Sequence, residues 1–252
     1  MNKTSIVKRD NSVLKALFAM PEPGMPCKYI LVVCHGFRGR KENSNRIFNF
    51  AKQVNELGIG VIAFDFTGCG ESDGAFADIT VSRQAQDLSL VIQYIHENYK
   101  LPVILLGRSM GGSTILAGGA QDSRVEGYIF WSACIDLKKT FAAGLQEKYE
   151  DLEKGKTVQL KDESGIYSLK PDFVQDFDCH NMDAYLQHIG NRPVLIIHGT
   201  DDEVVTPDDG KYIFEKVANG ELYLVEGADH QFTNREAERE NLTLDWLKKY
   251  FG

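Results

Sequence analysis

The sequence contains no run of about 18 apolar residues, the length that a membrane-spanning helix requires. It also lacks a Walker A motif, an H-E-x-x-H motif and any group of cysteines and histidines at zinc-binding spacing. Basic residues are in the minority, since 28 lysines and arginines stand against 36 aspartates and glutamates, for a net charge of −8. This acidity opposes binding to nucleic acid or to an anionic membrane surface. We therefore expect no nucleic-acid partner, no stable membrane anchoring and no cofactor.

Cysteine is scarce, with five residues scattered along the chain. An odd, dispersed set argues against a disulfide framework and fits a reducing compartment, so we expect a cytoplasmic protein. With 252 residues, 43% of them hydrophobic, the chain is long enough for one large α/β domain with a proper core. The sequence leaves the oligomeric state open, a homodimer included.

Short apolar segments alternate with longer amphipathic segments along most of the chain. After an N-terminal pair of strands that turns at residues 10–12, strands are predicted at residues 29–34, 60–66, 102–106, 125–131, 192–198 and 221–225. Helices are predicted at residues 43–57, 80–98, 109–121, 207–217 and 242–251. This alternation predicts an α/β fold in which helices cover both faces of a mostly parallel sheet.

Residues 133–190 interrupt this alternation. They contain no convincing strand of the sheet, but they carry a charged stretch and scattered aromatic residues. A segment of this length is too long for a plain connection. We expect a cap or lid here, folded over the carboxyl ends of the strands where ligands bind in open α/β sheets. Residues 1–132 and 191–252 would then form the core.

The pattern G-x-S-x-G occurs twice, at residues 70–74 and 107–111. A nucleophile elbow needs a strand leading into the serine and a helix leading out of it. Only the second match follows an apolar strand and opens into a helix of small residues, whereas the first continues into a turn at Asp73 and Gly74. Ser109 is therefore the candidate nucleophile, and Ser72 is not. A helix N-cap role would also suit Ser109, but it would not explain the glycines on both sides.

A serine nucleophile needs a base, and the base needs an orienting acid. On elbows of this kind the chain order is Ser, then Asp or Glu, then His. His230 follows the last predicted strand, where a loop can reach over the sheet, and it is the preferred base. His198 ends a strand and is better explained as hydrogen-bonded to its own loop. The acid is Asp201 or Asp202, which the residues alone do not separate.

Two backbone N–H groups should meet the negative charge that develops on the carbonyl oxygen. One belongs to Met110, directly after the serine. The other is expected in the loop after the first buried strand, where Gly36 allows close approach and the N–H of Phe37 is the natural donor.

Five short motifs occur in a specific order: HGF at 35–37, DFTGCGES at 65–72, GRSMGG at 107–112, HGTDDEVV at 198–205 and GADH at 227–230. Together they resemble the α/β-hydrolase family over nearly the whole chain. The resemblance implies an eight-stranded sheet, favours Asp202 as the acid and makes Ser72 structural. One residue departs from the family pattern, because Arg108 stands where relatives often have His or Gln.

Within that family, the sequence is most similar to cinnamoyl/feruloyl-type carboxylesterases and monoacylglycerol-lipase-like esterases. The resemblance implies a serine esterase that hydrolyses small carboxylic esters, hydroxycinnamoyl or short-chain acyl esters among them, through an acyl-enzyme. Candidate substrate-binding residues are His35, Trp131, Phe141, Tyr167 and Phe173, although a packing role suits the aromatic ones equally well. A thioester, peptide or carbon–carbon hydrolase would use the same triad, and an inactive binding module remains a third reading.

Overall fold

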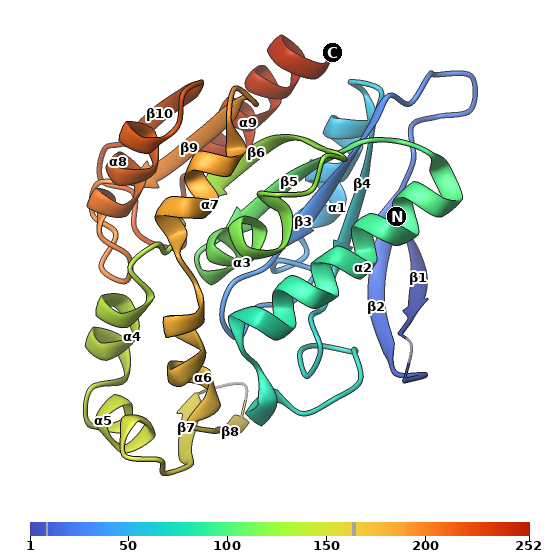
Figure 1. The fold of residues 1–252 in the computed structure, drawn as a ribbon. Helices are drawn as coiled ribbons and strands as arrows, with labels where there is room; N and C mark the ends of the chain where they lie inside the picture. The colour runs from blue at the N-terminus through green and yellow to red at the C-terminus, as the bar shows by residue number, and fades with distance from the viewer. Residues whose placement is uncertain (9, 163–164) are drawn as a thin grey trace.

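The computed structural model describes residues 1–8, 10–162 and 165–252. Its main sheet has eight strands in the order β1-β2-β4-β3-β5-β6-β9-β10. The strand β2 runs antiparallel to both β1 and β4, and the six strands from β4 to β10 are parallel (Figure 1). The strands are β1 (Asn2–Val7), β2 (Val13–Ala19), β3 (Tyr29–Cys34), β4 (Ile59–Phe64), β5 (Val103–Arg108), β6 (Val125–Trp131), β9 (Val194–Gly199) and β10 (Gly220–Val225). The predicted α/β fold with a mostly parallel eight-stranded sheet is confirmed.

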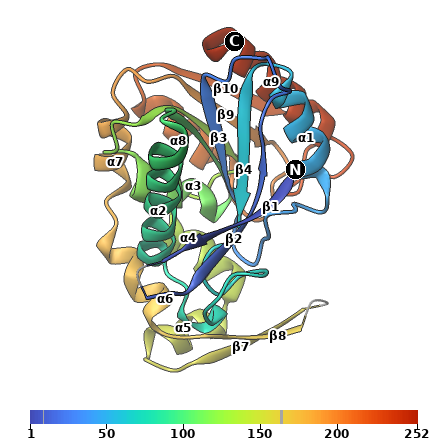
Figure 2. The same ribbon diagram turned by 90° about the vertical axis from the view of Figure 1, so that its right-hand side faces the viewer.

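Helices cover the two faces of the sheet unequally (Figures 1 and 2). One face packs against α1 (Arg46–Asn55) and α9 (Glu236–Phe251), and the other against α2 (Val81–Tyr99), α3 (Met110–Gly119), α7 (Met182–Ile189) and α8 (Pro207–Lys216). Side chains of a strand alternate between faces, so Leu31 joins the α1 and α9 side while Ile30 and Val32 join the other. Burial on both faces explains why these strands are continuous apolar runs.

The segment between β6 and β9 contains more regular structure than its sequence predicts. It comprises α4 (Leu137–Leu145), α5 (Glu147–Glu153), β7 (Val158–Asp162), β8 (Gly165–Leu169), α6 (Asp172–Gln175), the 3-10 turn η2 (Asp176–Cys179) and α7. The strands β7 and β8 form a separate antiparallel hairpin that the sequence did not reveal. Figure 1 shows α4, α5, α6 and this hairpin gathered beyond one end of the main sheet. The short 3-10 turn η1 (Phe76–Asp78) lies against β8.

The hydrophobic interior of this segment is continuous with that of the sheet. Phe141 and Phe173 from beyond the sheet end belong to the same buried cluster as Leu105 of the central strand. Leu186 of α7 also belongs to it, and α7 packs against α3 and α8. Buried side chains from residues 133–190 therefore join the cluster on one face of the sheet, and α7 lies in the helix layer of that face. The division into a core and a cap stays a prediction.

Helix α1 begins three residues later than the periodicity predicts. Asn43, Ser44 and Asn45 have φ angles of 44°, 54° and 65°, so three consecutive residues adopt the left-handed conformation. L-residues rarely form such runs, because their Cβ atoms crowd the following carbonyl oxygen. The loop before α1 is consequently held by tertiary contacts rather than by local preference. Helix α9 begins earlier than predicted, at Glu236 instead of residue 242.

Candidate active site

The parallel strands bring the candidate residues to one edge of the sheet. The carboxyl ends of β3 and β5 are in register, with Cys34 opposite Gly107, and Arg108 pairs with Trp131 of β6. The loops that leave this edge carry the five motifs noted above. This shared edge explains how residues almost two hundred positions apart meet at one site.

Ser109 lies on a sharp turn between β5 and α3. Its φ of 52° and ψ of −125° place it in a conformation that non-glycine residues rarely adopt. Its backbone N–H donates to the Trp131 carbonyl at 2.9 Å, and its carbonyl accepts from Gly112 at 2.8 Å and from Cys134 at 3.1 Å. These three main-chain hydrogen bonds hold the strained turn, as a nucleophile elbow requires.

Two positions of the elbow have no room for a side chain, so only glycine fits them. A Cβ on Gly107 would lie 2.4 Å from the Gly111 carbonyl oxygen, and a Cβ on Gly111 would lie 2.4 Å from the Cys34 carbonyl oxygen. The start of α3 therefore packs directly on the ends of β3 and β5. The G-x-S-x-G pattern at this position is a requirement of backbone packing, which a cap serine would not impose.

The second G-x-S-x-G match has a different role. The Ser72 hydroxyl donates to the Asp65 carbonyl at 2.6 Å and accepts from the Lys15 N–H at 2.9 Å. The first bond closes the loop after β4 on itself, and the second ties this loop to β2 of the N-terminal hairpin. Ser72 is thus structural, as the sequence context predicts.

His230 and Asp202 form a close pair. The ring Nδ1 of His230 lies 3.0 and 2.9 Å from the two carboxylate oxygens of Asp202, and both side chains are buried. Because a carboxylate only accepts, Nδ1 carries the proton and Nε2 is left to act as a base. Asp201, the alternative acid, is exposed and accepts instead from the Thr200 hydroxyl.

Asp202 also contacts a second histidine. The Nε2 of His198 lies 3.2 Å from the Asp202 carboxylate and 2.9 Å from the Val205 carbonyl oxygen. Burial alone would raise the pKa of Asp202, but hydrogen bonds from His198, His230 and the Val205 N–H outweigh it and hold the pKa well below its usual range. The carboxylate is therefore charged at neutral pH and fixed in orientation.

The loop after β3 lies against the elbow. A Cβ on Gly36 would come within 2.9 Å of the Ser109 Cβ, so the chain passes directly beside the nucleophile. The His35 ring pins this loop, because Nε2 accepts from the Phe66 N–H at 3.3 Å and Nδ1 donates to the Gly36 carbonyl at 2.8 Å. Burial lowers the pKa of His35, which keeps the ring neutral in these roles. Phe37 follows at the position expected for one N–H donor.

The first N–H groups of a helix have no acceptor within the helix. Met110 is the first residue of α3 and follows Ser109 directly. Its N–H is therefore available beside the nucleophile, where the helix dipole also favours negative charge. With the Phe37 N–H it forms the candidate oxyanion hole.

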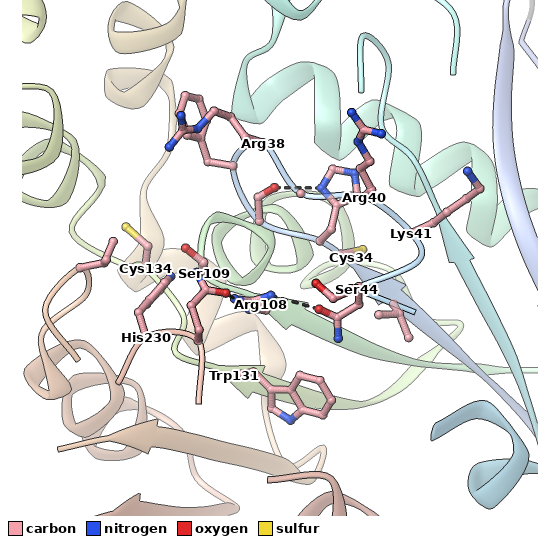
Figure 3. A pocket seen from close by; sticks show the side chains of 18 of the residues that line it. Cys34, Arg38, Arg40, Lys41, Ser44, Arg108, Ser109, Trp131, Cys134 and His230 are labelled. Atoms are coloured by element: carbon pink, nitrogen blue, oxygen red, sulfur yellow. Dashed lines mark hydrogen bonds between the residues drawn. The ribbon is translucent and has the colours of Figure 1, made fainter. Parts of the chain in front are cut away.

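A cavity of about 700 Å³ opens at this edge, and both Ser109 and His230 line it (Figure 3). Its walls come from the end of β3 and the loop that follows it to residue 45, from the ends of β5 and β6, from α4, and from the loops that carry Val204 and Gln231. Of the predicted substrate-binding residues, His35, Trp131 and Phe141 line it. Trp131 also donates from its indole N–H to the Thr243 hydroxyl at 3.0 Å.

Two residues expected in the pocket lie elsewhere. Phe173 is fully buried and packs against the rings of Phe37 and Phe141 at centroid distances of 5.3 and 4.9 Å, tilted to the first and edge-to-face with the second. Tyr167 packs on Phe76 at 5.1 Å. In the described part of the chain, neither lines the cavity, because the hairpin and α6 place them behind its wall. Sequence reasoning missed Asn43, Gln231 and Leu145, which do line it and which carry no motif.

A buried ion pair braces the same loop. The Asp65 carboxylate accepts from the Lys41 N–H at 2.8 Å and from the Lys41 ammonium at 2.7 Å. It also accepts from the Glu71 N–H at 2.9 Å, and a Cβ on Gly70 would overlap it. Asp65 is fully buried and Lys41 is 3% exposed. Burial alone would lower the pKa of Lys41, but its hydrogen bonds to Asp65, Glu42 and Glu71 outweigh it and raise the pKa.

Replacing Lys41 with methionine should lower the free energy of unfolding by about 3–5 kcal/mol, because it leaves the Asp65 charge buried without a cation. Urea unfolding followed by circular dichroism measures this loss. Lys3→Met is the matched control, since Lys3 contacts Glu71 at 3.0 Å but is exposed. Exposed pairs contribute little, so this control should unfold like the wild type. Equal losses in the two variants would contradict the bracing role.

In residues 1–8, 10–162 and 165–252, no helix is both long and apolar enough to cross a lipid bilayer. Across the same ranges, no three histidine, cysteine, aspartate or glutamate side chains are grouped as metal binding would require.

The chain is similar to several known proteins. The sequence profile of the serine aminopeptidase, S33, family matches residues 26–181, which is more than half of the chain. A 31.7 kDa Escherichia coli protein of the traX–finO intergenic region is 27% identical, over 79% of this chain and 82% of its own. The mitochondrial palmitoyl-protein thioesterase ABHD10 of Mus musculus is also 27% identical, over 71% of this chain and 61% of its own.

A structural comparison agrees with the topology. Est1E from Butyrivibrio proteoclasticus, solved with bound ferulic acid, superposes with a TM-score of 0.77 at 22% identity and covers 98% of this chain and 97% of its own. This likeness shows that the fold is that of the α/β-hydrolases. The profile match covers β3 through η2 and so includes the elbow with Ser109. The chain therefore belongs to the serine aminopeptidase, S33, family of α/β-hydrolases.

Proposed function

We propose that this protein is a serine hydrolase that cleaves small carboxylic esters through an acyl-enzyme. The observation that carries the proposal is the arrangement of Ser109 on a strained elbow, with His230 lining the same cavity and held by the buried Asp202 carboxylate. Support also comes from the similarity to a structure with bound ferulic acid and to a palmitoyl-protein thioesterase.

The proposed reaction follows from the roles of these groups. His230 accepts the Ser109 hydroxyl proton through Nε2 while the oxygen attacks the ester carbonyl carbon. The N–H groups of Phe37 and Met110 donate to the oxyanion that forms. The tetrahedral intermediate collapses, the C–O bond to the alcohol breaks, and His230 returns the proton to the leaving oxygen. A water molecule, deprotonated by His230, then releases the acid and restores Ser109.

The charge of the cavity favours esters over peptides with a free N-terminus. An aminopeptidase must hold the ammonium group of its substrate, and a carboxylate is the partner that binds an ammonium group most strongly. Among the described lining residues, Glu42 is the one that carries a carboxylate, and the Lys41 ammonium lies 2.8 Å from it. The family name therefore does not decide the substrate of this chain. A thioester remains the second candidate, because a curated relative is a thioesterase and the acyl-transfer chemistry is the same.

A matched substrate panel tests the proposal. 4-Nitrophenyl butanoate, methyl ferulate, S-phenyl thiobutanoate and L-alanine 4-nitroanilide should be compared by kcat/KM. We expect an oxygen ester to exceed about 10⁴ M⁻¹s⁻¹, within the usual enzyme range, and the anilide to be at least a hundredfold slower. Faster cleavage of the anilide would reject the ester proposal. Failure of a fluorophosphonate probe to label the folded protein would favour a binding module instead.

A further inference from the structure

Arg108 lies directly before the proposed nucleophile, where its side chain lines the cavity between Ser109 and Ser44 (Figure 3). One terminal nitrogen donates to the Asn43 amide oxygen at 3.1 Å, and the other donates to the amide oxygen of Gln231. The Nε is buried and has no hydrogen-bond partner among the described residues. A guanidinium has five N–H donors, so each terminal nitrogen keeps one further N–H after these two bonds, beside the buried one on Nε.

The charge of Arg108 is not compensated locally. Both hydrogen-bond partners of its guanidinium are neutral amides. Within the described ranges, no carboxylate oxygen lies within 4.0 Å of the guanidinium. Arg46 in the neighbouring layer shows the usual arrangement, because it pairs with both oxygens of Glu240 at 2.8 and 3.0 Å. Burial lowers the pKa of Arg108, and the charges of Asp202 and Asp229 offset this only in part.

A second buried guanidinium adds to the positive charge behind the site. Arg239 lies over the Trp131 ring at 4.2 Å and over the Phe232 ring at 4.9 Å. Burial, together with the charge of Arg108, lowers the pKa of Arg239 to about 9. A buried charge without an ionic partner destabilises a fold. Packing alone therefore does not explain why arginine stands at positions 108 and 239.

The cavity is basic although the protein is acidic overall. Its lining includes Arg38, Arg40, Lys41 and Arg108 but a single carboxylate, Glu42, in a chain of net charge −8. Figure 3 shows the side chains of Arg40 and Lys41 extending away from Ser109. Lys41 is also neutralised by Asp65. Arg108 directly precedes Ser109, and Figure 3 shows its side chain beside the serine at the reacting end of the cavity.

We propose that Arg108, steadied by Asn43 and Gln231, binds a carboxylate carried by the substrate, so that the preferred substrates are esters with a free acid group. The inference rests on the proposed ester hydrolysis. One uncompensated positive charge with spare N–H donors matches one carboxylate, which a guanidinium binds through charge-assisted hydrogen bonds. A phosphate, with a charge of about −1.5 to −2, would exceed it.

Two pairs of esters test the inference, one with the acid on the acyl side and one with it on the alcohol side. Mono-4-nitrophenyl glutarate is compared with 4-nitrophenyl hexanoate, and 4-carboxyphenyl butanoate with 4-methylphenyl butanoate. The quantity measured is the ratio of kcat/KM for the acid to that for its neutral partner. Because the same two esters are compared in every enzyme, differences in leaving-group reactivity cancel.

Arg108→Gln should lower this ratio about tenfold or more for one of the two pairs of esters. The loss should come chiefly from a higher KM for the ester that carries the carboxylate. Arg108→Lys, which keeps the charge, should retain most of the preference. Asn43→Asp supplies a carboxylate to the guanidinium from within the protein. It should therefore lower the ratio like Arg108→Gln while raising the melting temperature, a combination that a merely structural arginine would not give.

The outcomes separate the two proposals. Hydrolysis of the neutral esters by the wild type supports the ester function, whatever Arg108 does. Ratios that agree within twofold among the wild type, Arg108→Gln and Asn43→Asp, for both pairs, would overturn the carboxylate site while leaving that function intact. Should Arg108→Gln fail to fold, Asn43→Asp and competitive inhibition of the wild type by glutarate, with glutaramide as the neutral control, decide the question. Equal inhibition by the two compounds would reject the site.

Discussion

Replacing Ser109 with alanine should lower kcat for 4-nitrophenyl butanoate by about a millionfold, the cost of removing the nucleophile in a serine protease. Alanine cannot form the acyl-enzyme, so only the oxyanion donors and substrate binding would remain, and these still accelerate hydrolysis about 10³- to 10⁴-fold over water. The hydrogen bonds that hold the elbow are all made by the main chain of residue 109. The variant should therefore fold like the wild type. Burst kinetics and labelling by a fluorophosphonate, followed by mass spectrometry, provide the measurement.

Ser72→Ala is the matched control, because it removes a serine from the same five-residue pattern. It loses the hydrogen bonds to Asp65 and Lys15, so a loss of about 1–2 kcal/mol in unfolding free energy is expected with kcat nearly unchanged. Should Ser109→Ala retain more than a hundredth of the wild-type rate while Ser72→Ala does not, the assignment of the nucleophile would be reversed.

Asp202→Asn should lower kcat by about 10⁴-fold. An amide at this position holds His230 in the wrong tautomer, with the proton on Nε2, the nitrogen that has to act as the base. It also no longer balances the positive charge that His230 acquires during the reaction. Asp201→Asn, one residue away and exposed, is the control and should keep its activity within about twofold. Steady-state kinetics of both variants, with unfolding curves to exclude a folding defect, distinguish the two aspartates.

The same substitution has a pH signature in stability. The pKa of Asp202 is lowered in the folded protein, so its ionised form stabilises the fold above the unfolded pKa of about 3.9. That contribution is lost as the pH falls further, toward the folded pKa. The difference in unfolding free energy between the wild type and Asp202→Asn should therefore be largest near neutral pH and narrow below about pH 4. A difference that grows on acidification would contradict the lowered pKa.

Local sequence patterns predicted the sheet well. The strands at 29–34 and 125–131 match the structure at both ends, because each is a mostly apolar run whose side chains are largely buried, with the exposed Glu126 as the exception. The two G-x-S-x-G sites could be separated because a strand, a turn and a helix are contiguous in sequence. The pairing of His230 with Asp202 could be inferred only from chain order and from the family resemblance that favoured Asp202 over Asp201, since two residues 28 positions apart share no periodic signal.

The cavity walls could not be predicted in the same way. Phe141 and Phe173 look alike in sequence, yet α4 places the first on the wall and α6 places the second behind it. Hydrophobic periodicity predicts a helix that includes Asn43, whereas its backbone is left-handed in the structure. The hydrogen bond from Arg108 to its side chain comes from a residue 65 positions away, which periodicity does not reveal. Contacts between residues far apart in the sequence decide which side chains reach a cavity. Hydrophobic periodicity carries no information about such contacts.

The elbow fixes the backbone of residue 109 without reference to its side chain. Gly107 and Gly111 leave room for the turn, and the hydrogen bonds that hold it come from main-chain atoms. The fold thus fixes a backbone position from which a cysteine thiol or an aspartate carboxylate would project in the same direction as the serine hydroxyl. Exchange of one reactive group for another needs no rebuilding of the scaffold, so the chemistry of such an enzyme can diverge in evolution while its architecture stays constant.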